Sequence, residues 1–159
     1  MAFEMHNNGP PITEARISAV EHKLGIVLPG GYLAFLMRNN GGIPKPRFFP
    51  IRGLDDNPFG GIQLFFGIDE TVRSADLEWN YETFSGRIPH NLLPIACDDA
   101  GNLICISLNG VDGDMVYLWY HDDEHTPPTY NNVYFIAESF AAFLESIHFE
   151  ELVIQSQKN

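Results

Sequence analysis

The sequence lacks basic residues over almost half of its length. From Ile88 to Gln157 there is no Lys or Arg, whereas the same stretch holds 11 acidic side chains. The chain of 159 residues carries a net charge of −12. A negative field of this kind repels nucleic acid and anionic lipid and attracts a basic protein. We therefore expect no nucleic-acid partner and no membrane partner, with acidity for solubility alone as the alternative interpretation.

Cysteine is scarce as well. Cys97 and Cys105 are the two cysteines of the chain, and both fall in segments that we expect to be strands. If the turn DDAGN between these segments closes a hairpin, Cys97 faces Leu103 and Cys105 faces Ile95, so the two sulfur atoms are not opposed. Neither cysteine has the basic neighbours that would activate a thiolate. The sequence thus favours two buried free thiols over a disulfide or a catalytic cysteine.

Long apolar runs and catalytic signatures are also missing. No stretch approaches the roughly 20 apolar residues of a membrane-spanning helix, and the N-terminus has no basic segment followed by an apolar one. The chain contains no GxSxG, GxxxxGK[ST], GxGxxG or HExxH motif. These absences predict a cytoplasmic protein that is not an enzyme, with no cofactor and no metal site.

What the sequence does contain is a run of three short apolar segments separated by the turn-rich sequences DDAGN and NGVDGD. The segments are Leu93–Cys97, Leu103–Leu108 and Met115–Tyr120. Short apolar segments between such turns predict an antiparallel meander. Each segment is apolar at successive positions, so both of its faces must be covered. We therefore place the meander in the middle of a sheet.

Further elements are expected around this meander, within one domain over residues 12–149 and with frayed termini at residues 1–11 and 153–159. Helices are indicated by capping residues and by apolar side chains that recur every three to four positions. The expected helices lie between Thr13 and Gly25, between Pro29 and Asn39, between Asp69 and Phe84, and from about Glu138; the expected strands are Lys45–Ile51 at a sheet edge, Ile62–Gly67 and Val133–Ile136, with Gly53–Gly61 as a loop.

Tracing the meander brings acidic side chains to one end of the predicted sheet, because the turn DDAGN and the sequence HDDEH both follow strands that end there. As metal ligands, His121 and His125 are four positions apart but lie in a predicted loop, not on one face of a helix, and DDAGN lacks the spacing of a calcium loop. An acid/base pair for hydrolysis would require a cleft. A docking surface for a basic protein requires only accumulated charge, and solvated acidic turns remain an equal alternative. The residues expected to bind a partner are Asp98, Asp99, Asp122, Asp123 and Glu124.

Four groups of residues, in chain order, carry a resemblance to a known family. They are Leu24, Gly25, Leu28, Pro29, Tyr32, Phe35, Leu36, Asn40, Gly41 and Gly42; Ile95, Asp98, Gly101 and Asn102; Val116, Tyr117 and Trp119; and Ser139, Phe140, Phe143 and Leu144. As a set, they resemble the SUKH superfamily, over about residues 12–147. The chain departs from the family in the aromatic turn, where Trp119 is followed by Tyr120 and His121 instead of the common Asp-His-Glu.

The resemblance implies an α+β domain with a single mixed, mostly antiparallel sheet and helices packed against it. It also implies a non-enzymatic role, since bacterial SUKH proteins are mostly immunity proteins that bind polymorphic toxins, many of them nucleases. Our leading hypothesis is a protein that neutralises a cognate, basic toxin domain through its acidic surface. A scaffold of the cell-wall-signalling type is the alternative, and a metal- or small-ligand-binding enzyme is the third. The sequence leaves the oligomeric state open.

Overall fold

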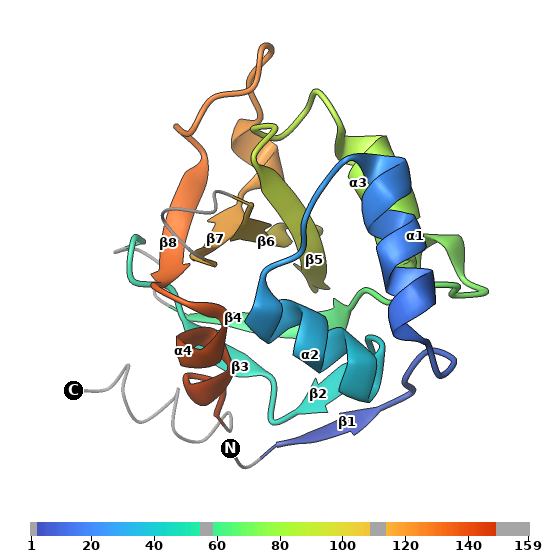
Figure 1. Ribbon diagram of the computed structural model, residues 1–159. Coiled ribbons are helices and arrows are strands. Elements are labelled where there is room, and N and C mark those ends of the chain that lie inside the picture. The colour runs from blue at the N-terminus through green and yellow to red at the C-terminus, as the bar shows by residue number, and fades with distance from the viewer. Residues whose placement is uncertain (1–2, 55–58, 109–113, 149–159) are drawn as a thin grey trace.

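The computed structural model describes residues 3–54, 59–108 and 114–148, and these form an α+β fold (Figure 1). Six strands make one antiparallel sheet in chain order: β3 (Phe48–Pro50), β4 (Phe59–Phe65), β5 (Leu92–Asp98), β6 (Leu103–Ser107), β7 (Val116–Trp119) and β8 (Val133–Ala137). A two-stranded antiparallel sheet pairs β1 (Glu4–His6) with β2 (Ile43–Lys45). The helices are α1 (Glu14–Leu24), α2 (Gly30–Asn39), α3 (Leu77–Phe84) and α4 (Phe140–Glu145). The expected fold class is confirmed.

The predicted meander is β5–β6–β7, and it occupies the interior of the six-stranded sheet. All five residues of β6 are buried, as expected for a strand covered on both faces. Cys97 pairs with Leu103, as predicted. A bulge between Pro94 and Ala96 places Cys105 opposite Pro94, so the expected pairing of Cys105 with Ile95 is wrong. Both thiols are free.

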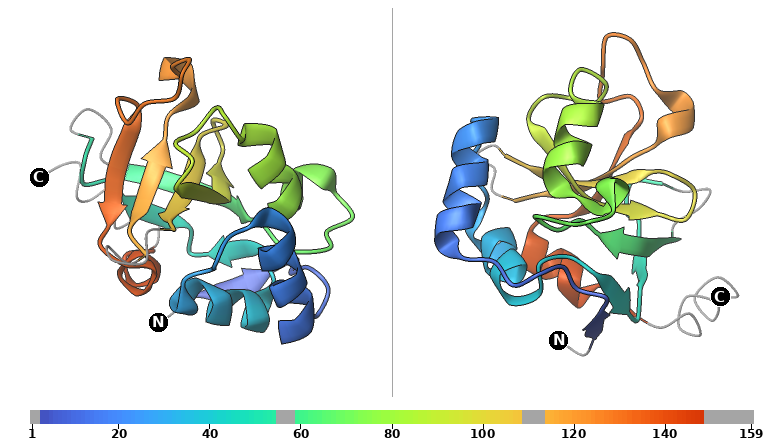
Figure 2. Two further views of the ribbon diagram at one scale, coloured as in Figure 1. Left: turned by 45° about the horizontal axis from the view of Figure 1, so that its top comes forward. Right: turned by 90° about the vertical axis from the view of Figure 1, so that its right-hand side faces the viewer.

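The sheet is bent until its two ends nearly meet. Figures 1 and 2 show β4 running across the direction of β7 and β8, and the β4–β5 pairing shifts register between Ile62 and Leu64, which bends a strand pair. Beyond β3, the backbone N–H of Gly53 donates a hydrogen bond of 3.0 Å to the carbonyl oxygen of Phe135 in β8. A Cβ at Gly53 would lie 2.8 Å from the Phe135 nitrogen, so this close approach requires glycine.

The core lies between this bent sheet and the helices. Its centre is a group of aromatic rings in edge or tilted contact, with centroids 4.9 to 6.3 Å apart, contributed by α2, α4, β3 and β4. The residues of this group are Tyr32, Phe35, Phe49, Phe65, Phe140 and Phe143. Helices α1 and α3 lie side by side (Figures 1 and 2), joined by ion pairs from Arg16 and Lys23 to Glu78.

Helix termini agree with the sequence except in one segment. Thr13 caps α1 and Gly25 ends it, and Ser139 caps α4. The helix predicted from Asp69 instead begins at Leu77 with Asp76 as its cap. The reason is a tertiary contact: Gly67 bridges Asp76, and Asp69, at φ 62°, turns its carboxylate to Arg16.

Two further expectations need correction. Glu4–His6 lies in the stretch expected to be frayed, but it pairs with β2, a contact that local sequence does not encode. The loop expected over Gly53–Gly61 ends earlier, because Phe59 already pairs with Pro50 of β3. The edge strand predicted over Lys45–Ile51 is confirmed for Phe48–Pro50, which form β3, whereas Lys45 belongs to β2 of the two-stranded sheet. The tail at residues 153–159 and most of the turn NGVDGD lie outside the described residues.

Candidate binding surface

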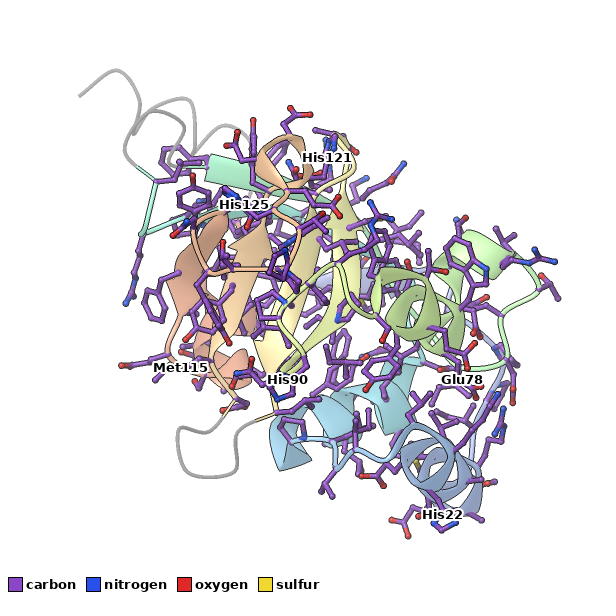
Figure 3. The ribbon with its side chains drawn as sticks, turned by 90° about the horizontal axis from the view of Figure 1, so that it is seen from above. His22, Glu78, His90, Met115, His121 and His125 are labelled. Carbon is purple, nitrogen blue, oxygen red and sulfur yellow. The ribbon has the colours of Figure 1, made fainter. Side chains whose placement is uncertain are left out.

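The structure brings the β5–β6 turn, residues 98–102, against the short 3₁₀ helix His121–Asp123 that follows β7. The backbone N–H of His121 donates to the Asn102 side-chain oxygen at 3.1 Å, and His121 Nε2 lies 2.7 Å from the Ala100 carbonyl oxygen. In Figure 3, His121 lies where β5 and β7 end, whereas His90 and Met115 lie at the opposite end of these strands. We call the surface formed by Asp98, Asp99, Asp122, Asp123 and Glu124 the acidic end.

Asp98 holds the β5–β6 turn together. Its Oδ1 accepts hydrogen bonds from the backbone N–H groups of Ala100 (2.9 Å) and Asn102 (2.8 Å), and its Oδ2 accepts from the Asn102 side chain (2.9 Å). An aspartate that bonds the backbone two residues ahead is a common way to fix a tight turn. The Asn102 side chain in turn binds the His121 N–H. Asp98 therefore positions the 3₁₀ helix as well as its own turn.

Asp99 is paired with a basic residue from a distant part of the chain. Arg47 Nη1 lies 2.9 Å from Asp99 Oδ2, and the Arg47 guanidinium lies 4.7 Å from the centre of the Phe48 ring. The Asp99 side chain is 60% exposed. The ion pair therefore removes only part of the negative charge that Asp99 presents to solvent.

Glu124 is engaged more fully. Arg87 forms a two-point ion pair with it, at 3.0 and 2.9 Å, while the Arg87 guanidinium lies over the rings of Phe84 (4.7 Å) and Trp119 (6.0 Å). The hydrogen bonds from Arg87 hold the pKa of Glu124 below its ordinary value. This arrangement fastens the end of the HDDEH sequence to the segment that follows α3.

Asp122 and Asp123 are exposed at the acidic end, as Asp99 is. Asp122 is 70% exposed and lies 3.5 Å from His121 Nδ1; within the described residues, Asp123 has no ion-pair partner. The sequence pointed to these five acids as a candidate surface but did not reveal Arg47 and Arg87, which form ion pairs with Asp99 and Glu124. The signal for these two arginines was weak, because each is 37 or more positions from its partner in the chain.

An apolar groove of about 210 Å³ lies beside the acidic end. Ile51 and Leu118 are 3% and 2% exposed and form part of its wall, and Tyr120 and Phe59 add aromatic rings. The β5–β6 turn supplies its polar edge: Asp98, Asp99, Ala100 and Asn102. The groove exists because the sheet is bent, which brings β3 and β4 opposite β7. The linear sequence contains no signal for it.

A larger hollow, of about 360 Å³, lies between β1, α2 and α4. Its lining includes Phe3, Met5, Phe35 and Leu144, and its charged group is Arg38. Among the described residues that line this hollow there is no carboxylate, so it does not form part of the acidic end.

The site offers charge and shape more than reactive groups. Among residues 3–54, 59–108 and 114–148, no cluster of three or more His, Cys, Asp or Glu side chains could hold a metal ion. Burial raises the pKa of the Cys97 thiol to about 11 and raises that of Cys105 further, which keeps both thiols protonated near neutral pH. None of the helices in the described part of the chain has the length and apolarity to cross a bilayer.

These features define a class of protein: an α+β domain with a bent antiparallel sheet, whose most distinctive surface is a set of acidic turns beside an apolar groove. The chain belongs to the SMI1/KNR4 family (SUKH-1), whose family model matches residues 11–146. Domains of this family are commonly toxin-immunity or regulatory proteins and are generally not catalytic.

One relative comes from Bacillus subtilis (strain 168), where it is described as an SPbeta prophage-derived uncharacterized protein, YokK. The two sequences are 25% identical over 150 residues, covering 85% of this chain and 74% of YokK. The description of YokK contains no activity, so the comparison supports the family and leaves the partner to be argued from the structure.

Proposed function

We propose that this protein is a cytoplasmic, non-enzymatic immunity protein that binds a cognate toxin domain directly through its acidic end. The observation that carries the proposal is the combination of family membership with the placement of acidic residues. Asp122 and Asp123 are exposed at one end of the sheet, and the segment that contains them, residues 88–157, has no Lys or Arg. The charge thus faces outward at a defined surface.

The five acids divide into two roles in this proposal. Asp98 and Glu124 have their carboxylates engaged by the turn and by Arg87, so they shape and fasten the surface. Asp122, Asp123 and the exposed side of Asp99 supply the charge that a partner meets. Fixed positions matter because a partner then does not have to order these side chains on binding.

A basic toxin, such as a nuclease, is the partner whose chemistry matches this surface. A nuclease cleft is positively charged because it grips phosphates. An acidic surface that covers such a cleft gains a fast, electrostatically steered association that weakens as salt screens the charges. The same surface repels nucleic acid, so the immunity protein would not itself bind the nucleic acid that is the toxin's substrate.

The test is co-purification of this protein with the toxin domain encoded beside its gene, followed by association kinetics of single-residue variants. Asp123→Lys should slow association by about three- to tenfold and flatten its dependence on salt. Glu138→Lys is the matched control, because it makes the same change in charge at the opposite end of the sheet, where β8 finishes. It should leave the association rate nearly unchanged.

Two outcomes would count against the proposal in different ways. Failure to form a complex with any neighbouring toxin domain would refute the immunity function. A complex whose association rate responds equally to Asp123→Lys and Glu138→Lys would retain that function but remove the acidic end as its binding surface.

A further inference from the structure

We infer that the groove beside Asp99 receives one arginine side chain of the partner protein. This inference rests on the proposed function, in that the acidic end binds a basic protein, and it names the chemistry that the groove recognises. The groove holds about 210 Å³, far more than the roughly 30 Å³ that one water occupies in the liquid. It is therefore large enough for a long side chain to enter.

The lining of the groove matches an amphipathic side chain. Ile51, Leu54 and Leu118 give it an apolar wall, whereas the turn residues Asp98 and Asp99 stand at its polar edge. A long basic side chain buries its methylene stem against an apolar surface while its charged head stays near water or a carboxylate. A purely apolar side chain would leave the carboxylates without a new partner, and an acidic one would be repelled.

The charge around the groove selects a cation. Asp98 and Asp99 are the two carboxylates of the lining; the oxygens of Asp98 bond the turn, and Asp99 is 60% exposed. The ion pair from Arg47 Nη1 to Asp99 Oδ2, at 2.9 Å, shows that the carboxylate accepts a guanidinium in this position. A second guanidinium can approach the exposed side of Asp99 or displace Arg47.

Aromatic rings favour arginine over lysine. Tyr120 and Phe59 line the groove, and the planar guanidinium stacks on aromatic faces and is more weakly hydrated than an ammonium group. The same preference is visible within the molecule, where Arg47 lies over Phe48 and Arg87 lies over Phe84, both at 4.7 Å.

The experiment is an NMR titration of the ¹⁵N-labelled full chain with Nα-acetyl-arginine methylamide. The neutral, equally shaped citrulline analogue and the lysine analogue serve as matched probes. The arginine probe should bind with a millimolar dissociation constant and shift the amide signals of Ala100, Asn102, Leu118 and Tyr120. The lysine probe should bind several-fold more weakly, and the citrulline probe should not shift these signals.

Variants assign the binding to the groove. Asp99→Asn should weaken the arginine probe at least about threefold, and Arg47→Ala, which frees Asp99, should strengthen it. Ala100→Trp adds an indole at an exposed position of the lining and should block the probe by shape without changing any charge. Asp122→Asn should have little effect, because Asp122 is not part of the lining. Each variant is first checked for the fold by its amide spectrum.

The inference fails if the citrulline probe shifts the same signals equally, if Asp99→Asn and Ala100→Trp bind the arginine probe as the wild type does, or if no groove signal moves at millimolar probe. The toxin co-purification is a separate measurement. If the wild type and Ala100→Trp bind the toxin equally well, the groove inference is refuted while the immunity function is retained. If the arginine probe binds in the groove but no toxin binds the protein, the groove inference is retained and the immunity function is refuted.

Discussion

The side chain of Asn40 pairs with the backbone of Ile68 as a neighbouring strand would. Its Oδ1 accepts the Ile68 N–H at 2.8 Å, and its Nδ2 donates to the Ile68 carbonyl oxygen at 2.9 Å and to that of Pro10 at 2.6 Å. Asn40 is 2% exposed and has a φ of 47°, in the left-handed region that ends α2. One residue thus ends a helix and joins three segments that are far apart in the chain.

Asn40→Ala should lower the free energy of unfolding by about 3 kcal/mol, because it leaves the buried Ile68 groups unpaired and forces alanine into the left-handed region. Asn40→Gly should cost about 1 kcal/mol less than alanine, since glycine accepts this φ freely. Urea unfolding measures both values. Asn39→Ala is the control and should stay within about 0.5 kcal/mol of wild type. A loss below about 1 kcal/mol in Asn40→Ala would contradict the structural role of this side chain.

Asp98 and Asp122 should behave differently although both are acids of the same surface. Asp98→Ala removes three hydrogen bonds that hold the β5–β6 turn, and it should destabilise the fold by about 1–2 kcal/mol. Asp122→Ala should change stability by less than about 0.5 kcal/mol, since its side chain is 70% exposed. Thermal or urea unfolding of the two variants and the wild type measures this difference in stability. Equal effects of the two substitutions would mean that Asp98 is not the organiser of this turn.

The ion pair of Glu124 with Arg87 predicts a dependence of stability on pH. Hydrogen bonds from Arg87 lower the pKa of Glu124 in the folded protein below its ordinary value of 4.5. A carboxyl with a lowered pKa stabilises the fold above the unfolded pKa and loses that contribution as pH falls through the folded pKa. Glu124→Gln should therefore cost about 0.5–1 kcal/mol at pH 7, a value reduced by solvent screening, and the difference should disappear as the pH falls from 7 through the folded pKa.

Urea unfolding of wild type and Glu124→Gln across this pH range gives the measurement. Arg87→Ala should cost more than Glu124→Gln at neutral pH, because it also removes the contacts over Phe84 and Trp119. A difference between wild type and Glu124→Gln that is constant with pH would show that the carboxylate charge does not contribute.

The two cysteines should be unreactive in the folded protein. Burial, with a smaller contribution from Asp98, raises the pKa of Cys97 to about 11, and burial alone raises that of Cys105. The thiolate that attacks a disulfide reagent is thus rare at pH 8. We expect both thiols to react with 5,5′-dithiobis-(2-nitrobenzoate) at least about a hundredfold faster in denaturant than in the native state. Fast labelling of one thiol in the native protein would show that Cys97 is activated.

Local patterns were sufficient for most of the fold. The cap at Thr13 and the glycine at position 25 are short-range signals, and each works through hydrogen bonds or backbone freedom within a few residues. The apolar strands of the meander were identified for a similar reason, since apolar residues at successive positions predict burial of both faces of a strand. The prediction failed at Asp69, where a local capping signal was overridden by Arg16, 53 positions away.

The candidate surface was predictable only in part. Counting strands put the DDAGN turn and the HDDEH sequence at one end of the sheet, because antiparallel strands alternate in direction. The partners of these acids could not be found in this way. Arg47 and Arg87 reach Asp99 and Glu124 through the path of the chain in space, and the groove depends on how far the sheet bends.

The sequence by itself determined the family, the order of the helices and of strands β3 to β8, and the acidic character of the C-terminal half, because these follow from residue types and their spacing. Only the tertiary structure decided which acids face solvent, which are held by arginines, and that an apolar groove lies beside them. Long-range contacts such as Gly53 with Phe135, Arg47 with Asp99 and Arg87 with Glu124 fix these features. The energies of such contacts depend on distances between residues that the chain order does not specify.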